Sequence, residues 1–476
     1  MSGTPRTPQL RAPASAAVMQ REAGLHRSLS PRQLSMIAIG GAIGTGLFLG
    51  SAISVQMAGP GVILSYCAGA AIALMVMWAL AEMVVAHPVA GSFGVHAELY
   101  LHPWAGFVVR YTYWLCQVVA IGSEVVAAAI YCRFFFPGVP SWIWIASFSV
   151  AMVLVNAMSV ASFGWFEYGF AMIKVITISV FLVLGGALLF GVGFPRVGFA
   201  NYTSHGGFLP HGWTGVALGV AMAIFSYMGL EVVAVTSGEA ARPDIAVPRA
   251  LRWTLFRLGI FYIGGLSLVV GLVSWNQVGL GESPFVRVFQ TVGIPFAAMM
   301  MNAVVLTAVL SSVNCNLYLT SRMIFSLARG GYAPAALGAL TRRGTPVRAL
   351  LVSSAGMVAA MAVDHWFHET AYVYMAGTAF FGGIFVWIMI MVTHLAFRRA
   401  AVHQAKPPLR FAPRGPWSTL LGLGALLGVL GSTWFIPGLR ITLKAGIPWL
   451  VFISLCYLGW SRWNPRTTAQ GEVSHG

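Results

Sequence analysis

The sequence predicts an all-α integral membrane protein, and three features support this fold class. Only 8% of the residues are charged and 58% are hydrophobic, with a mean hydropathy of +0.80, whereas roughly a quarter of the residues in an ordinary soluble domain are charged. Apolar stretches long enough to span a bilayer recur along the chain, and two of them are interrupted by glycine. One polytopic helical bundle therefore explains this chain better than several soluble domains.

Twelve transmembrane helices are expected, because a spanning helix needs about 20 mostly apolar residues. The third and eighth are long and are expected to be tilted or to extend beyond the hydrocarbon core. The expected helices cover residues 34–56, 61–86, 104–134, 141–160, 167–191, 213–238, 252–275, 294–327, 348–363, 371–397, 417–436 and 446–461.

Two tails flank this region. Residues 1–33 contain Pro, Ser, Ala and Arg but no apolar core of a signal peptide, so we expect a flexible cytoplasmic tail there. Residues 462–476 form the expected C-terminal tail, also cytoplasmic.

Lys and Arg predict the orientation. With both termini in the cytoplasm, 22 of the 28 basic residues fall on the cytoplasmic side, five fall outside, and Lys174 lies within a helix. This is the distribution that the positive-inside rule requires. The net charge of +16 is therefore read as orientation signals, since the basic residues form no nucleic-acid-binding domain. We expect a plasma (inner) membrane protein whose partner is the lipid bilayer, with no nucleic acid; the sequence indicates no protein partner.

The five cysteines lie scattered in apolar stretches, without metal-binding or redox spacing, and are expected to be small core residues. The histidines form no metal-ligand spacing within a helix. The sequence therefore predicts neither a metal site nor catalytic residues, and no enzyme is expected.

The two interrupted helices carry most of the functional information. Residues 36–52, MIAIGGAIGTGLFLGSA, contain five glycines, and residues 221–239, AMAIFSYMGLEVVAVTSGE, contain a second break. Inside a bilayer, such breaks are tolerated only where the freed backbone groups line a cavity or meet a ligand. Glycines can also serve close helix packing. Two breaks at corresponding places in two halves, however, are typical of the substrate site of a secondary transporter.

The breaks predict a site for a zwitterion. A half-helix beginning near Leu47 directs its N–H groups toward an anion such as a carboxylate, and a half-helix ending at 225–228 directs carbonyl groups toward an ammonium group. Together they suit an α-amino acid. The expected substrate-binding residues are Ile43, Gly44, Thr45, Gly46, Phe225, Ser226, Tyr227 and Met228.

Four ionisable residues are expected at membrane depth, where charge is costly and usually functional. Glu124 lies among small residues and is expected to face the bundle interior, and Glu231 follows the second break. They and the other two, Lys174 and Glu82, are candidates for proton coupling or internal ion pairing. Each has a structural alternative: Glu82 can pair near the interface, Lys174 can snorkel, and Glu231 can brace amides that the break frees.

Several stretches also resemble the amino acid transporter (amino acid permease) family of the amino acid–polyamine–organocation superfamily. IAIGGAIGTGLFLGSA is similar to the first-helix signature of that family, and GPGVILSYCAGAAIALMVMWALAEM with AGSFGVHA to its second helix and the following loop. FSYMGLEVVAVTSGEAARPDIAVPRA and SSVNCNLYLTSRMIFSLARGGYAP resemble its sixth and eighth helices with their loops. The matches run from about residue 30 to about residue 350. His96 departs from the family, where tyrosine is usual.

The resemblance implies a leucine-transporter-type 5+5 fold. Helices 1–5 (residues 34–191) and helices 6–10 (residues 213–397) would form inverted repeats, with helices 1 and 6 broken, and helices 11–12 (residues 417–461) would lie outside. It implies that the backbone of Gly44 to Gly46 holds the substrate carboxylate and that residues 225–227 take its amino group, with Phe225 as a gate. Lys174 matches a lysine thought to replace sodium, so protons are the expected coupling ion and sodium is not; no other cofactor is expected.

We therefore expect a secondary active amino acid permease that takes up a neutral amino acid with protons by alternating access. Glu124 is the first choice for the proton-carrying carboxylate and Glu231 the second. The alternatives are an amino acid exchanger, a transporter of polyamines or cationic amino acids, and, from another class, a membrane amino acid sensor without net transport. The sequence does not identify the amino acid.

Overall fold

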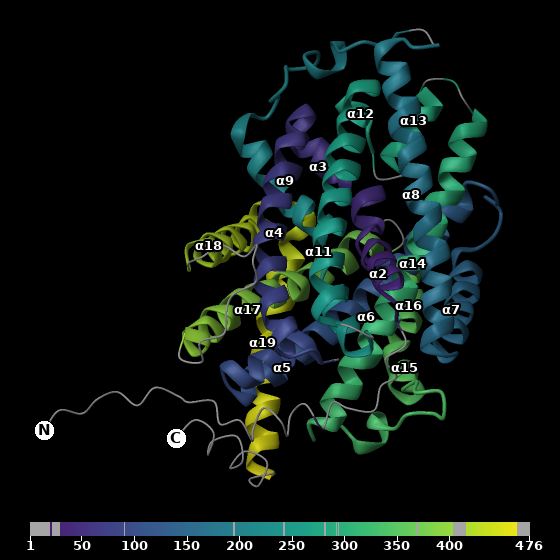
Figure 1. The fold of residues 1–476 in the computed structure, drawn as a ribbon. Helices are drawn as coiled ribbons and strands as arrows, with labels where there is room; N and C mark the ends of the chain where they lie inside the picture. Colours follow the sequence, from purple (N-terminus) through teal and green to yellow (C-terminus); the bar gives the residue numbers. More distant parts are fainter. Residues whose placement is uncertain are drawn as a thin grey trace, which may run out of the picture.

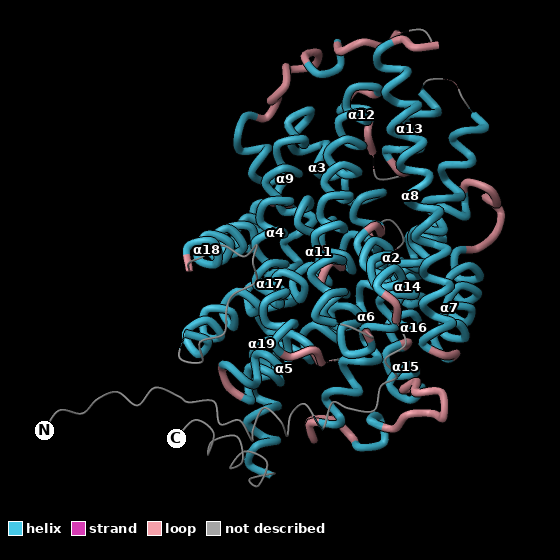
Figure 2. The backbone as a smooth tube through the Cα atoms, in the orientation of Figure 1, coloured by secondary structure: helices cyan, strands magenta, loops and turns pink. Residues whose placement is uncertain are grey.

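The computed structural model describes residues 20, 29–89, 91–193, 196–240, 243–279, 282–291, 293, 295–367, 370–402 and 416–463. Most of the expected N-terminal tail, the C-terminal tail from residue 464 onward and residues 403–415 lie outside the described residues. Within the described residues, the regular elements are helices (Figure 2). In addition, Leu29 and Ala240 form one isolated β-bridge.

The first and sixth expected helices are both divided. The first consists of α2 (Pro31–Ala42), a π-helical turn (Gly46–Gly50) and α3 (Ser51–Ala58), and the sixth of α9 (Gly212–Tyr227) and α10 (Val232–Thr236). The other membrane-length elements are α4 (Val62–Ala86), α6 (Pro103–Arg133), α7 (Ser141–Ala157), α8 (Val160–Phe190), α11 (Pro243–Gly259) continued by a π-helical turn (Ile260–Gly264, η5) and α12 (Gly265–Leu272), α14 (Pro295–Arg329), α15 (Val347–Ser353) with α16 (Ala355–Trp366), α17 (Ala371–Val402), α18 (Trp417–Ser432) and α19 (Arg440–Trp463).

Ten helical segments among the described residues are long and apolar enough to cross a membrane. One of them, Arg32–Ala86, covers two of the expected helices, and α7, an apolar helix of 17 residues, is shorter than these ten segments. The prediction of an all-helical, multi-pass membrane protein is confirmed.

Two short helices lie in expected loops. α5 (Ser92–Tyr100) contains the stretch AGSFGVHA only from Ser92 onward, and α13 (Pro284–Thr291) precedes α14. Phe285, Val286, Val288 and Phe289 of α13 are buried, so this helix packs its apolar side onto the bundle. α5 and α15 lie at one end of the bundle, and α12 and α13 at the other (Figure 1).

α6 lies at the centre of the bundle and packs most extensively on α14 and α17. Small residues allow helices in membranes to approach closely, because lipid tails supply no hydrophobic force between helices. Gly356 of α16 illustrates this: a Cβ atom added there would overlap the backbone carbonyl of Val118 on α6. Close packing around α6 provides the rigid frame for the two broken helices.

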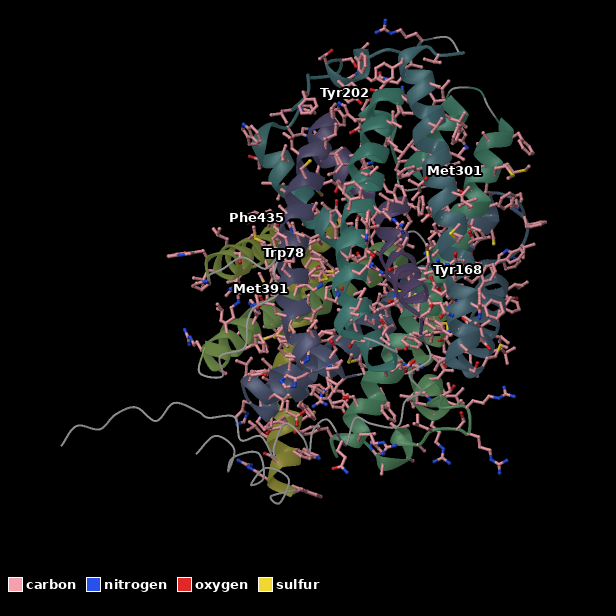
Figure 3. The ribbon with its side chains drawn as sticks, in the orientation of Figure 1. Trp78, Tyr168, Tyr202, Met301, Met391 and Phe435 are labelled. Carbon is pink, nitrogen blue, oxygen red and sulfur yellow. The ribbon has the colours of Figure 1, made fainter. Side chains whose placement is uncertain are left out.

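The outward-facing side chains are apolar, as the bilayer requires. Large exposed hydrophobic residues occur on α8, α18 and α19, and include Trp165, Val183, Leu421 and Leu455. Side chains project from the bundle along its whole length in Figure 3, where Phe435 is labelled; this side chain is 71% exposed. In water this surface would be a liability, whereas against lipid it is the favourable arrangement.

Candidate functional site

The first break lies where the glycines predict it. α2 ends at Ala42, and Ile43 leaves the helix with φ −84° and ψ 90°. The helical backbone resumes at Thr45, with φ −59° and ψ −26°, and continues through the π-helical turn and α3. The second half-helix therefore begins two residues before the expected Leu47, and residues 43–44 form the interruption.

The second break follows Tyr227. Met228 is extended, with ψ 149°, and Gly229 has φ +98°, a left-handed conformation that glycine adopts without strain. α10 then starts at Val232. A Cβ atom at position 229 would overlap the carbonyl of Gly41, so glycine here also lets the second break touch α2.

The two breaks lie side by side. α3 packs on α9 and α2 on α10, so the two broken helices are antiparallel. Ser226 Oγ lies 2.8 Å from the carbonyl oxygen of Gly46. The hydroxyl of Tyr262 lies 2.7 Å from the carbonyl oxygen of Ala42 and 3.0 Å from that of Ser226, so one side chain bridges both breaks.

The remaining candidate substrate-binding residues surround this contact. Tyr227 is buried, and its hydroxyl donates to the carbonyl of Tyr66 at 3.3 Å. The carbonyl of Thr45 lies 3.5 Å from the hydroxyl of Tyr372 on α17. Phe225 meets Phe380 edge to face, with ring centroids 5.8 Å apart. The structure thus brings all eight predicted residues into one region formed by both breaks.

The cavity beside the breaks is nearly closed. It has a volume of about 10 Å³, close to the minimum for one water molecule. The structure therefore shows an arrangement in which an amino acid has no room, and access requires movement of the elements that line the cavity. Its lining residues are Ile53, Met222, Phe225, Tyr372, Val373, Ala376, Phe380 and Leu439.

Lys174 on α8 points at the first break. Its side chain is fully buried, and Nζ donates to the carbonyl oxygens of Gly40 at 2.6 Å and Ile43 at 2.7 Å. Snorkelling is excluded, because the ammonium group lies inside the bundle. The lysine thus satisfies carbonyl groups at the end of α2 that the interruption leaves without helical partners.

Two carboxylates accompany this ammonium group. Glu124 on α6 accepts hydrogen bonds from Ser312 Oγ and, at 3.1 Å, from Asn316 Nδ2. Glu167 on α8 is held by α14 in the same way, through Ser311 and Asn314. Both carboxylates interact electrostatically with Lys174. Glu124 and Lys174 are therefore brought together as candidates, and Glu167 joins them.

Sequence reasoning missed Glu167, because it placed this residue at the very start of the expected fifth helix. The helix begins earlier, at Val160, and Glu167 lies two turns inside it. Its spacing was the available signal: seven residues before Lys174 is two helical turns, which puts both side chains on one face.

Glu231 braces the second break. One carboxylate oxygen accepts from the backbone N–H of Gly229 at 3.0 Å and from Trp387 Nε1 at 3.3 Å, and the other accepts from the hydroxyl of Tyr113 at 3.1 Å. This is the structural alternative that the sequence left open for this residue.

Glu82 lies elsewhere. It contacts His394 Nε2 at 2.8 Å and Arg398 at 2.7 Å, both on α17. The structure gives it internal ion pairing and does not bring it to the breaks.

Two of the arginines counted on the cytoplasmic side are buried and paired. Arg110 pairs with Glu98 at 2.5 Å, and Arg322 pairs with Glu239 at 2.9 Å. Arg110 is fully buried and Arg322 is 3% exposed. Both have specific partners inside the bundle, which their positions near helix ends did not reveal.

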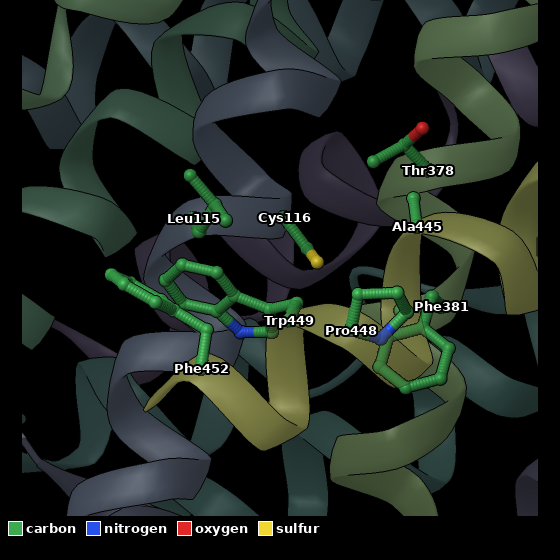
Figure 4. Close-up of a pocket in the computed structure, with 9 residues that line it drawn as sticks. Leu115, Cys116, Thr378, Phe381, Ala445, Pro448, Trp449 and Phe452 are labelled. Carbon is green, nitrogen blue, oxygen red and sulfur yellow. The ribbon is translucent and has the colours of Figure 1, made fainter. Parts of the chain in front are cut away.

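A larger cavity, of about 350 Å³, lies away from the breaks between α6, α17 and α19 (Figure 4). Leu115 and Cys116 approach it from α6, Phe381 from α17 and Trp449 from α19. Its lining is mostly apolar and includes no residue of either break, so it lacks the free backbone groups that suit an amino acid zwitterion. Within the described part of the chain, no group of three or more His, Cys, Asp or Glu side chains could hold a metal ion.

Comparison with known proteins identifies the family. The profile of the family described as amino acid permease matches residues 33–463. The chain is 40% identical over 438 residues to the aromatic amino acid transport protein AroP of Escherichia coli (strain K12), covering 91% of this chain and 95% of that protein. It is 37% identical over 440 residues to the gamma-aminobutyric acid permease of Bacillus subtilis (strain 168), covering 91% of this chain and 94% of that protein. These relatives are transporters, not enzymes, and the chain belongs to the amino acid permease family.

Proposed function

We propose that this protein is a secondary active permease that takes up a neutral amino acid together with protons by alternating access. The observation that carries the proposal is the antiparallel pair of broken helices whose interruptions meet at Gly46 and Ser226. Half-helices of this kind are the usual binding elements of secondary transporters.

The substrate would lie between the two breaks. The amides at the start of the half-helix from Gly46 face its carboxylate, and the carbonyl end of α9 faces its ammonium group. Phe225, which packs against Phe380, would close over it. The proposed substrate-binding residues are Ile43, Gly44, Thr45, Gly46, Phe225, Ser226, Tyr227 and Met228.

An apolar side chain is the favoured choice for the substrate. The cavity beside the breaks is lined by aromatic and aliphatic residues, including Met222, Phe225, Tyr372 and Phe380, and by no charged side chain. Names of relatives point the same way, since one is an aromatic amino acid transport protein. Another is a gamma-aminobutyric acid permease, which makes γ-aminobutyrate an alternative substrate. A polyamine lacks the carboxylate that the first break would hold.

Protons are the proposed coupling ion. The ammonium group of Lys174 occupies the carbonyl oxygens of Gly40 and Ile43, the kind of oxygen cluster that would otherwise suit sodium. Glu124 is the proposed proton carrier, since it interacts electrostatically with this ammonium group and is 6% exposed. Glu231 accepts hydrogen bonds from three donors at the second break, so it is better suited to bracing that break than to carrying a proton.

The proposed layout is twelve helices with two inverted repeats, residues 34–191 and residues 213–397, and with residues 417–461 outside them. The antiparallel packing of the two broken helices supports an inverted relation between the two repeats. The excess of Lys and Arg on one side supports cytoplasmic termini in the plasma membrane.

Uptake of labelled phenylalanine by proteoliposomes tests the proposal. With an inward proton gradient, labelled substrate should accumulate, and a protonophore should abolish the accumulation. Substrate flux that does not depend on the proton gradient but requires substrate inside the proteoliposomes would indicate an exchanger. Binding without any flux would indicate a sensor and overturn the proposal. Competition by unlabelled neutral, cationic and γ-amino acids and by polyamines then identifies the substrate class.

A further inference from the structure

We propose that Glu167 is the permanent counter-charge of Lys174, a positioning residue that leaves Glu124 available to bind and release the transported proton. This inference rests on the proposed function. It assigns different tasks to two buried carboxylates that the same helix, α14, holds in similar ways.

Glu167 and Lys174 meet at one residue of α2. A Cβ atom at Gly40 would overlap the carboxylate of Glu167, and the carbonyl oxygen of the same Gly40 accepts a hydrogen bond from Lys174 Nζ at 2.6 Å. Both side chains are fully buried. Glycine at position 40 therefore makes the space for the Glu167 carboxylate beside the residue whose carbonyl group binds Lys174, and the two side chains interact electrostatically.

α14 divides its polar residues between the two carboxylates. Ser311 and Asn314 bond Glu167, whereas Ser312 and Asn316 bond Glu124. Spacings of three and four residues keep each pair on one side of the helix. Two adjacent faces of α14 thus hold one carboxylate each, on either side of the first break.

The amide group of Asn314 is oriented as a hydrogen-bond donor toward Glu167. The side-chain oxygen of Asn314 accepts from Asn156 Nδ2 at 2.7 Å, so its NH₂ group is the part that faces Glu167, and it donates at 2.9 Å. A carboxylate that accepts such bonds is stabilised as an anion. Glu167 is also sealed from solvent, whereas Glu124 is 6% exposed. A group that exchanges a proton with water must be reachable by water, and Glu124 is the more exposed of the two carboxylates.

The charges balance with one proton. One ammonium and two carboxylate groups carry a net charge of −1, and a net charge is costly inside the bundle. When the Glu124 carboxylate takes up one proton from the outer solution, the group becomes neutral; release of that proton to the cytoplasm restores −1. Lys174 stays an ammonium and Glu167 a carboxylate throughout. Other titratable groups near the three are Cys315 on α14, Tyr372 on α17 and Tyr262 on η5.

Removing the charge of Glu167 should therefore weaken proton binding at Glu124. In Glu167→Gln, Lys174 and Glu124 form a neutral pair without any added proton, so Glu124 resists protonation. The full-length variant in proteoliposomes should show a pH profile of gradient-driven uptake that is shifted to lower pH by about 1 to 3 units. Counterflow of labelled against unlabelled substrate, with equal pH on both sides, should stay within about twofold of the unaltered protein.

Two further variants make the test specific. Glu167→Asp keeps the charge and should restore the original pH profile. Glu282→Gln, in an outer pair with Arg287, is the matched control for loss of a carboxylate and should leave the profile unchanged.

A Glu167→Gln protein with an unshifted profile and a uniformly lower rate would overturn the proposal in favour of a purely structural role. If Glu167→Gln does not fold, the Glu167→Asp variant decides: a shifted pH profile of uptake in that variant would also overturn the proposal. Failure of the unaltered protein to show any gradient-driven uptake would instead reject the proposed function itself.

Discussion

Lys174 Nζ lies 2.7 Å from the carbonyl oxygen of Ile43, the residue at which the first membrane helix leaves its helical path. A buried charge on α8 thus replaces the helical hydrogen bond that the break removes from α2. This one contact removes two costs. An unpaired peptide group is unfavourable in lipid, and so is an unpaired ammonium group. Any change of this contact should affect both the shape of the break and the charge of the site.

Replacing Lys174 with Ala should reduce gradient-driven uptake at least tenfold or abolish its pH dependence. Two hydrogen bonds to a charged group are lost, each worth about 1.5 to 3 kcal/mol, and the two carboxylates lose their counter-charge. Uptake measured between pH 5 and pH 8 checks this. Lys444→Ala, an exposed lysine on α19, is the control. Unchanged rate and pH dependence in Lys174→Ala would show that the internal ammonium has no role in coupling.

Replacing Gly46 with Leu should abolish transport while the protein still inserts into the membrane. A Cβ atom at this position would lie 2.8 Å from the Cα atom of Ser226, which is too close, and overpacking of this kind costs about 1 to 3 kcal/mol. Uptake and the amount of inserted protein are the two measurements. Gly424→Leu on α18, where a Cβ atom meets nothing within 4 Å, should keep its activity. Normal uptake by Gly46→Leu would refute the proposed binding site between the breaks.

Replacing Glu124 with Gln should separate transport from the proton gradient. The amide keeps most of the hydrogen-bonding shape toward Ser312 and Asn316 but cannot take up a proton. We expect counterflow to remain measurable and gradient-driven accumulation to fall at least tenfold. A variant that still accumulates substrate with the original pH profile would make Glu124 a structural residue, and Glu231→Gln would then be the next candidate to examine.

Acid should destabilise the protein through His96. Burial lowers the pKa of His96 from 6.5 to about 3, and its Nε2 lies 3.0 Å from the carbonyl of His87. The unfolded chain therefore binds a proton that the folded protein does not, so the stabilisation is complete above pH 6.5 and declines as the pH falls toward 3. Between pH 6.5 and pH 5 the loss is about 2 kcal/mol at 1.36 kcal/mol per unit.

Thermal unfolding in detergent at pH 7.5, 6.5 and 5.0 measures this loss. His96→Tyr removes the titrating group and places there the residue that is usual in the family. Its unfolding temperature should fall less with acid than that of the unaltered protein, and equal falls for both proteins would contradict the role given to His96.

The helices and the breaks could be predicted from the sequence because their causes are local. Apolar length alone predicts where the backbone must be helical in lipid, and α6 and α14 begin and end within about two residues of the expected bounds. The five glycines of residues 36–52 likewise predict the interruption at residues 43–44. The short helices α5 and α13 were not expected, since each is too short to produce an apolar stretch of membrane length.

The partners of the buried charges could not be predicted, because each comes from a distant part of the chain. Gly40 is 134 positions from Lys174, Ser311 is 144 from Glu167, and Arg398 is 316 from Glu82. Sequence position suggested that Glu231 could brace the second break, yet only the fold brings Trp387 and Tyr113 to its carboxylate. Arg110 and Arg322 looked like orientation signals until packing supplied Glu98 and Glu239.

By itself, then, the sequence determined that this chain is a helical membrane protein with two interrupted helices, since hydrophobic length and glycine act on the backbone where they stand. Only the tertiary structure decided which charges meet at the first break, that Glu167 is among them, and that the two breaks touch. Those contacts depend on how α2, α8 and α14 pack together, and helix packing in lipid is set by side-chain shape and polar pairing between segments far apart in the chain.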